Sequence, residues 1–181
     1  MAGKRLFVGL DFPESITAAL VRLDPRLKGV RWLKAEQIHL TLAFLGRVEE
    51  HAEEILRTQL SAIRFHSFFL PLQSLGTFPG KGAPKILWVG VGSGHPHLFQ
   101  LHKKVMDAAL AAGLEPDLRP WHPHVTLARC EDVSGERLRP FLREHESLDL
   151  GLVPINAFAL KSSRLTPAGS IYSTELSIAA S

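Results

Sequence analysis

Short apolar runs with the period of a β-strand alternate along this chain with segments whose apolar residues recur at helical spacing. The first run, Arg5 to Leu10, predicts a buried strand, and Pro13 predicts the start of a helix. Gly46 is expected to end a strand, and Pro140 to kink or shorten a helix. The pattern as a whole predicts strands over 5–10, 38–45, 68–75, 85–91, 123–129, 153–160 and 171–178, a helix that begins at 13, helices over 49–63, 97–112 and 134–144, and loops over 76–84, 116–120 and 161–170.

These elements recur in the same order in the two halves of the chain. The matched segments, separated by 81, 85 and 83 residues, are 6–10 with 87–91, 39–42 with 124–127, and 70–73 with 153–156. Solenoid repeats are much shorter, about 20–50 residues, so a duplicated lobe is the better interpretation. We expect an α+β, bilobal fold: two pseudo-symmetric lobes, each with a mostly antiparallel sheet flanked by helices, and an active-site cleft between them. Residues 1–181 would form a single domain of two interleaved, duplicated lobes.

Each tetrad of the second matched pair carries a histidine and a threonine two positions apart. Residues i and i+2 of a strand point to the same face, so His39 is expected beside Thr41 and His124 beside Thr126. One such pair is readily explained as a hydrogen-bonded core histidine next to a strand-forming threonine. Two pairs at matched places in a repeat favour a site that both lobes share.

Two imidazoles in one site can supply a base and an acid. Histidine titrates near pH 6.5, and a positive charge on one ring disfavours a proton on the other. General acid and general base catalysis are each worth on the order of 10²–10⁴-fold in rate. Threonine hydroxyls can donate hydrogen bonds to phosphoryl oxygens, where negative charge accumulates. No acidic cluster lies near either tetrad in the sequence to hold Mg²⁺. The pattern therefore predicts phosphodiester chemistry without a metal.

A metal site is the alternative for the histidines. His122 and His124 form an H-x-H pair, and His95 and His97 repeat that spacing. A catalytic zinc needs about three protein ligands, and no Asp or Glu is placed to complete either pair. We therefore expect neither a metal nor another cofactor.

Composition and charge narrow the class of protein only moderately. The 181 residues are 45% hydrophobic and 22% charged, as is usual for a globular domain. A net charge of +3 and a pI of about 9.2 mildly favour an anionic ligand, but a slightly basic surface without a partner explains them equally well. Cys130 is the only cysteine, which excludes an intrachain disulfide and fits a cytoplasmic protein. No apolar run reaches the ~18–20 residues that span a membrane, so we expect no membrane partner, and we expect a monomer.

The two tetrads resemble the paired H-x-T-x motifs of the 2H phosphoesterase superfamily. The fuller pattern is similar to its RNA 2′,3′-cyclic phosphodiesterases, once called 2′-5′ RNA ligases. The segments that carry the resemblance, in the family's order, are RLFVGL (5–10), IHLTLAFLG (38–46), LWVGV (87–91), PHVTLAR (123–129) and SRLTPAGSIY (163–172). The last segment departs from the pattern, since Ala168-Gly169-Ser170 stands where relatives often carry a Gly-Pro or Gly-Ala pair. This departure weakens the case for substrate contacts from that loop.

The resemblance implies hydrolysis of an RNA 2′,3′-cyclic phosphate end to a 2′-phosphate. It also implies reversible 2′-5′ ligation of RNA, with tRNA fragments among the substrates. His39 and His124 would be catalytic, with His124 as base and His39 as acid, although the symmetric motif leaves that polarity open. Thr41, Thr126 and Arg129 would bind the phosphate. For Arg129, a surface arginine at a strand end is the alternative.

Four other residues are weaker candidates. Phe44 and Tyr172 are candidates for contacts with a base or ribose, because aromatic faces stack on bases, but they are equally well explained as core aromatics. Lys81 and Lys85 flank the loop over 76–84 and could guide an RNA backbone. Two other functions stay open. The same site could act on small substrates, such as ADP-ribose 1″,2″-cyclic phosphate or 2′-5′ oligoadenylate, or the protein could bind RNA ends without catalysis.

Overall fold

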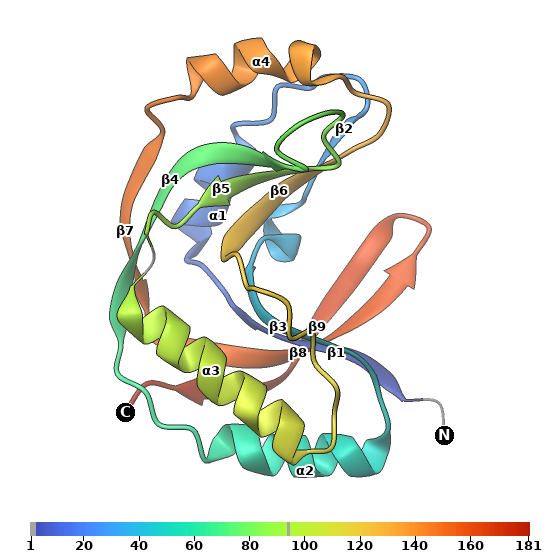
Figure 1. Cartoon of the computed structure of the whole chain (residues 1–181), viewed down its shortest axis with the longest axis vertical. Coiled ribbons are helices and arrows are strands. Elements are labelled where there is room, and N and C mark those ends of the chain that lie inside the picture. Colours follow the sequence, from blue (N-terminus) through green and yellow to red (C-terminus); the bar gives the residue numbers. More distant parts are fainter. Residues whose placement is uncertain (1–2, 94) are drawn as a thin grey trace.

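The computed structural model describes residues 3–93 and 95–181; Met1, Ala2 and Gly94, which belong to the predicted domain, lie outside it. The elements (Figure 1) are strands β1 Lys4–Leu10, β2 Val30–Trp32, β3 Leu40–Val48, β4 Phe68–Phe78, β5 Ile86–Gly90, β6 His124–Cys130, β7 Asp149–Ile155, β8 Ala157–Thr166 and β9 Gly169–Ala179, helices α1 Glu14–Val21, α2 Glu50–Ser61, α3 Pro96–Ala111 and α4 Gly135–Glu144, and the 3₁₀ helix η1 Ala35–Gln37. Among these residues, no helix is long and apolar enough to cross a membrane.

The strands form one sheet, in which two groups of strands meet at a single pair of residues. The order is β7-β4-β5-β6-β3-β1-β8-β9, and β2 pairs with β6. Pairing between these strands is antiparallel throughout. Within the part of the chain that the structure describes, Leu40 of β3 and Val125 of β6 form the one pair that joins the two groups. The prediction of an α+β fold with two antiparallel lobes flanked by helices is confirmed.

Helices cover the apolar face of the sheet and define where the core lies. In α2, Leu56 and Leu60 are one turn apart, so both point to the same side, where they are fully buried in the larger core. Helices α1 and α3 add buried residues to this core. A smaller core lies beneath α4, whose Leu138 and Phe141 pack with Leu87 of β5 and other residues. The face of the sheet away from these cores carries both polar and aromatic side chains.

Two of the matched segment pairs are direct neighbours in the sheet. Leu40 pairs with Val125, and these residues hold the same position in the two tetrads. Leu70 pairs with Val153, and these residues begin the third matched pair of segments. Antiparallel pairing of equivalent residues is the arrangement that a local twofold axis produces. Both pairings support two interleaved, duplicated lobes, which stay a prediction.

Two predicted boundaries near the site are wrong. Gly46 does not end its strand: it lies within β3 with a φ of 68°, next to a register shift against β1. Glycine adopts this backbone conformation without strain, so it accommodates an irregularity and lets the strand continue to Val48. The predicted loop over 76–84 begins too early, because Gly76 to Phe78 belong to β4 and pair with β5.

The end of the chain also differs from its prediction. The predicted strand over 153–160 is two strands, β7 and β8, separated by Asn156. The predicted loop over 161–170 is mostly a hairpin of β8 and β9 with a turn at 167–168. The hairpin carries many polar residues, so its apolar alternation is weak. Strand β2 was not predicted, because three residues are too few to show a period. Pro140 lies inside α4, and this helix continues to Glu144.

Candidate active site

Polar side chains flank the pair of residues that joins the two lobes. Leu40 and Val125 are fully buried, so the residues on either side of each point to the opposite face of the sheet. We call this the site face. Its polar residues next to the joining pair are His39, Thr41, His124 and Thr126.

The register of the two strands crosses the two motifs. Since β3 and β6 run antiparallel with Leu40 opposite Val125, the residue before one lies across from the residue after the other. His39 therefore lies across from Thr126, and Thr41 lies across from His124. The two tetrads thus form one group of four side chains, as the repeat predicts.

The imidazole of His39 is held at both nitrogens. Its Nδ1 lies 2.8 Å from the carbonyl oxygen of Gln37, and its Nε2 lies 2.9 Å from Oγ1 of Thr41. A carbonyl oxygen only accepts, so Nδ1 of the neutral ring carries the proton and donates it. Nε2 then keeps its lone pair, and the Thr41 hydroxyl donates to it.

His124 is held in the same tautomer, but at one nitrogen only. Its Nδ1 lies 2.7 Å from the carbonyl oxygen of His122, so this nitrogen also carries the proton. Among the residues that the structure describes, neither Nε2 of His124 nor the hydroxyl of Thr126 has a hydrogen-bond partner. The second motif therefore leaves both of these groups ready for a substrate.

Aromatic rings enclose each histidine. The ring of His39 lies 4.8 Å from that of Phe7 and 5.3 Å from that of Tyr172, measured between centroids. The ring of His124 lies 4.9 Å from that of Phe78 and 6.4 Å from that of Trp88. Such rings exclude water and hold the imidazoles in place.

Burial keeps both imidazoles neutral in the free protein. It lowers the pKa of His39 to about 4, even though the hydrogen bond to the Gln37 carbonyl opposes this shift, and the charge of Lys161 lowers the value further. Burial also lowers the pKa of His124, against the effect of its hydrogen bond to His122. Both rings therefore present a lone pair on Nε2 near neutral pH.

The predicted phosphate ligand Arg129 also lies on the site face. Thr126 pairs with Trp88 and Arg129 pairs with Ile86, and a register shift between these pairs places one extra residue in β6. Because of that extra residue, Thr126 and Arg129, although three positions apart, point to the same side. The Arg129 side chain is exposed.

The two predicted aromatic contacts differ in exposure. Phe44 pairs with Phe7, which places both on the site face, and Phe44 is 68% exposed. Tyr172 is half-buried and packs edge-on against Phe7 and His39. Phe44 is thus free to stack on a ligand, whereas Tyr172 packs against the ring of His39. Lys81 and Lys85 are exposed around the segment between β4 and β5, and make no hydrogen bond to the tetrads within the described residues. Their role in guiding an RNA backbone stays a prediction.

Comparison with known proteins identifies the family. A model of the 2′-5′ RNA ligase superfamily matches residues 12–160. The chain belongs to the 2′-5′ RNA ligase superfamily. The predicted resemblance is therefore confirmed.

Relatives in this superfamily span most of the chain. The RNA 2′,3′-cyclic phosphodiesterase of Aeropyrum pernix is 36% identical over 149 residues, which are 80% of this chain and 83% of the relative. The one of Archaeoglobus fulgidus is 32% identical over 171 residues, 93% of this chain and 96% of the relative. The crystal structure of E. coli LigT in apo form aligns with a TM-score of 0.83 at 25% identity, over 100% of this chain and 99% of that one.

Several residues of this candidate site escaped the sequence analysis. Phe7 and Trp88 hold the same position in the repeated strands, so the repeat itself could have marked them as partners of the histidines. Phe78 lies in the predicted loop and gave no signal. Lys161 is buried and bonded to Asp11, close enough to His39 to affect its pKa, and no local pattern marks it.

The histidine pair of His95 and His97 has a structural role. His95 caps α3, since its Nδ1 accepts a hydrogen bond from the backbone N–H of His97 at 3.1 Å. Its ring also stacks on Phe68, with 5.5 Å between centroids. Over residues 3–93 and 95–181, no group of three or more His, Cys, Asp or Glu side chains is placed to hold a metal ion.

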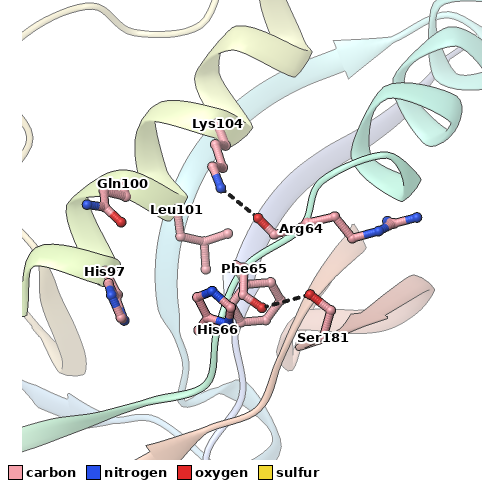
Figure 2. A pocket seen from close by; sticks show the side chains of 8 residues that line it. All are labelled: Arg64, Phe65, His66, His97, Gln100, Leu101, Lys104 and Ser181. Carbon is pink, nitrogen blue, oxygen red and sulfur yellow. Dashed lines mark hydrogen bonds between the residues drawn. The ribbon is translucent and has the colours of Figure 1, made fainter.

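A pocket of about 230 Å³ lies between α3 and the segment that links α2 to β4 (Figure 2). Its lining includes His66, His97 and Lys104, and the Lys104 ammonium donates to the carbonyl of Arg64 at 2.6 Å. The Nδ1 atom of His97 is buried there without a hydrogen-bond partner in the described part of the chain. The pocket is distinct from the site face, because its lining includes none of the tetrad residues.

Proposed function

We propose that this chain hydrolyses the 2′,3′-cyclic phosphate at an RNA 3′ end to a 2′-phosphate, by general acid–base catalysis that uses no metal. The observation that carries the proposal is the matched setting of His39 and His124. Each ring donates Nδ1–H to a main-chain carbonyl and so keeps the lone pair of Nε2 for proton transfer. The names of the superfamily relatives supply the substrate class.

The reaction needs two proton transfers: one proton is removed from the attacking water, and another is donated to the leaving oxygen O3′. Water attacks phosphorus and forms a new P–O bond, while the bond from phosphorus to O3′ breaks and the bond to O2′ stays. We assign His124 as the base that takes the proton of the water and His39 as the acid that protonates O3′. Because its low pKa keeps His39 neutral in the free protein, this assignment requires the negative charge of the bound phosphate to favour a proton on that ring.

The two threonines bind non-bridging phosphoryl oxygens in this scheme. The Thr126 hydroxyl is ready to do so, whereas the Thr41 hydroxyl must first leave Nε2 of His39. That exchange frees Nε2 at the moment that the substrate arrives. Arg129 adds a positive charge beside the phosphate, which stabilises the charge that develops on its oxygens.

The remaining substrate contacts are aromatic. We propose that Phe44, which is exposed on the site face, stacks on the base or ribose next to the cyclic phosphate. Tyr172 contacts the ribose from its place against His39. A 5′-hydroxyl of a second RNA can replace water in the same scheme, which would give 2′-5′ ligation. Ligation, tRNA fragments as substrates, the monomeric state and the cytoplasmic location stay predictions.

The test is hydrolysis of a short RNA that ends in a 2′,3′-cyclic phosphate, with EDTA present. We expect conversion to the 2′-phosphate, and near-complete loss of turnover in His39→Ala and His124→Ala with the fold retained. A 3′-phosphate product, or a variant that keeps most of the activity, would contradict the paired acid–base scheme. Binding of the RNA end without turnover would instead support the non-catalytic alternative.

A further inference from the structure

Two arginines lie directly opposite one another at the edge of the site face. In the pairing of β2 with β6, Arg31 is the partner of Arg129. Both side chains are exposed, and neither has a carboxylate partner or a hydrogen bond among the residues that the structure describes. Like charges directly opposite in a sheet repel each other and destabilise it. This pair therefore needs a reason other than stability.

The main chain holds Arg31 firmly in that place. The indole of Trp32, the next residue, donates to the carbonyl of Leu20 at 3.1 Å. The N–H of Leu33 donates to the carbonyl of Leu127 at 2.7 Å. Since the backbone is fixed just after Arg31, the sheet cannot relieve the repulsion by moving β2 away from β6.

The arginine pair continues the phosphate-binding side of the proposed site. Thr126 and Arg129 are three residues apart on β6, about 10 Å along a strand, and share the site face. Arg31 lies beside Arg129, about 4.8 Å away across the strands, on the edge of β6 that also pairs with β3. Arg31 therefore adds a second guanidinium at this end of the site face, where the next phosphate along a chain can bind.

We infer that Arg31 binds the internucleotide phosphate on the 5′ side of the cyclic phosphate, beside Arg129 on the reacting phosphate, so that the site prefers an RNA strand to a mononucleotide. This inference rests on the proposed function. Each guanidinium presents a planar fork of N–H donors that matches phosphate oxygens, and the negative charges of two neighbouring phosphates offset the repulsion between the two arginines. The ligand class is the phosphodiester backbone of single-stranded RNA.

A second like-charged pair lies at the opposite end of the site face and serves as the competing candidate. Arg5 pairs with Arg47 across β1 and β3. Arg47 is six residues from Thr41, twice the separation of Arg129 from Thr126, and its guanidinium already reaches the carbonyl of Gly3 at 3.5 Å. The Arg31 pair is therefore the better placed for the first phosphate beyond the site.

The experiment compares kcat/KM for a nucleoside 2′,3′-cyclic phosphate, a dinucleotide and a tetranucleotide with the same terminal nucleotide. We expect the wild type to prefer the dinucleotide to the nucleoside by about tenfold or more. Arg31→Met should lose most of this preference because KM for the dinucleotide rises. In this variant, kcat/KM for the dinucleotide should also depend less on salt. Arg31→Lys keeps the charge but not the planar fork of donors. Its preference for the dinucleotide should lie between those of the wild type and Arg31→Met. Arg139→Met, which removes an equal charge from the exposed side of α4, should match the wild type.

The outcomes separate this inference from the proposed function. If no cyclic phosphate is hydrolysed, the proposed function fails and this inference fails with it. If all three substrates are hydrolysed without any length preference, or if Arg31→Met keeps the length preference of the wild type, only the inference is overturned. Loss of the preference in Arg5→Met alone would assign the phosphate to the Arg5 pair. Arg31→Met should melt no lower than the wild type, because it removes a repulsion.

Discussion

The hydroxyl of Thr41 lies 2.9 Å from Nε2 of His39 and donates its hydrogen bond to that nitrogen. His124 has no such bond among the described residues, so the two halves of the site differ although their motifs match. A hydrogen bond to the lone pair of the neutral ring disfavours its protonation. We therefore expect Thr41→Val to raise the pKa of His39, and Thr126→Val to leave the pKa of His124 nearly unchanged. Titration of the imidazole carbon-bound protons by NMR measures both values, and equal shifts in the two variants would contradict the asymmetry.

The partly buried His39 makes the stability of the protein depend on pH. Its pKa is about 4 in the folded chain and near 6.5 when unfolded. Between these values the unfolded state binds more protons, so the free energy of unfolding rises with pH from about 4 to 6.5 and is level above. Because of His39, the free energy of unfolding rises by on the order of 3 kcal/mol over this pH range. We expect His39→Gln to lose less stability than the wild type on going from pH 7 to pH 4.5, as measured by urea unfolding.

The matched control for that measurement is His51→Gln, which replaces an exposed histidine on α2. It should keep the pH dependence of the wild type. If His39→Gln and the wild type lose the same stability on acidification, His39 titrates in the folded state much as it does in the unfolded chain.

A bridging sulfur in place of O3′ tests which histidine is the acid, because a thiolate leaves without a proton. With His39 as acid, His39→Ala should lose on the order of 10²–10⁴-fold on the oxygen substrate and far less on the sulfur substrate. His124→Ala should lose a similar factor on both. If the sulfur substrate instead restores His124→Ala and not His39→Ala, then His124 is the acid and His39 is the base. The low pKa of His39 favours the role of base in the free protein.

Exposure of Phe44 on the site face predicts a role in binding and none in folding. Phe44→Ala should raise KM for RNA by about tenfold, since base–aromatic stacking is worth roughly 1–3 kcal/mol, and should hardly change the melting temperature. The control is Phe69→Ala in β4, which removes a ring of similar exposure, 58% against 68%. An equal change of KM in both variants would show that Phe44 does not stack on the substrate.

Gly76 sets the position of the ring beside His124. A Cβ atom at Gly76 would lie 2.2 Å from the ring of Trp88, and that ring lies 6.4 Å from His124. Gly76→Ala must therefore displace Trp88, and we expect lower kcat together with a lower melting temperature. Gly80→Ala, where a Cβ atom meets nothing within 4 Å, should change neither. Wild-type kcat in Gly76→Ala would show that the position of Trp88 does not matter to catalysis.

The sequence alone predicted the parts of the site that rest on local patterns. The period of two placed Thr41 beside His39, and the repeat indicated that both tetrads belong to one site. Lys161 and Arg31 could not be predicted, because they reach the site through pairings between strands far apart in the chain. The strand after Gly46 was missed for a related reason, since only its pairing with β1 shows that a glycine there continues the strand. The catalytic and binding roles of the predicted residues stay predictions.

The single pair of Leu40 and Val125 has a mechanical consequence. If the two groups of strands tilt against each other, this pair is where the sheet bends, since no other described pair of strand residues joins the two groups. Points beside a pivot move least, and the four polar groups of the tetrads are the immediate neighbours of this pair. The outer strands can thus adjust to ligands of different shape while the four polar groups of the tetrads keep their spacing.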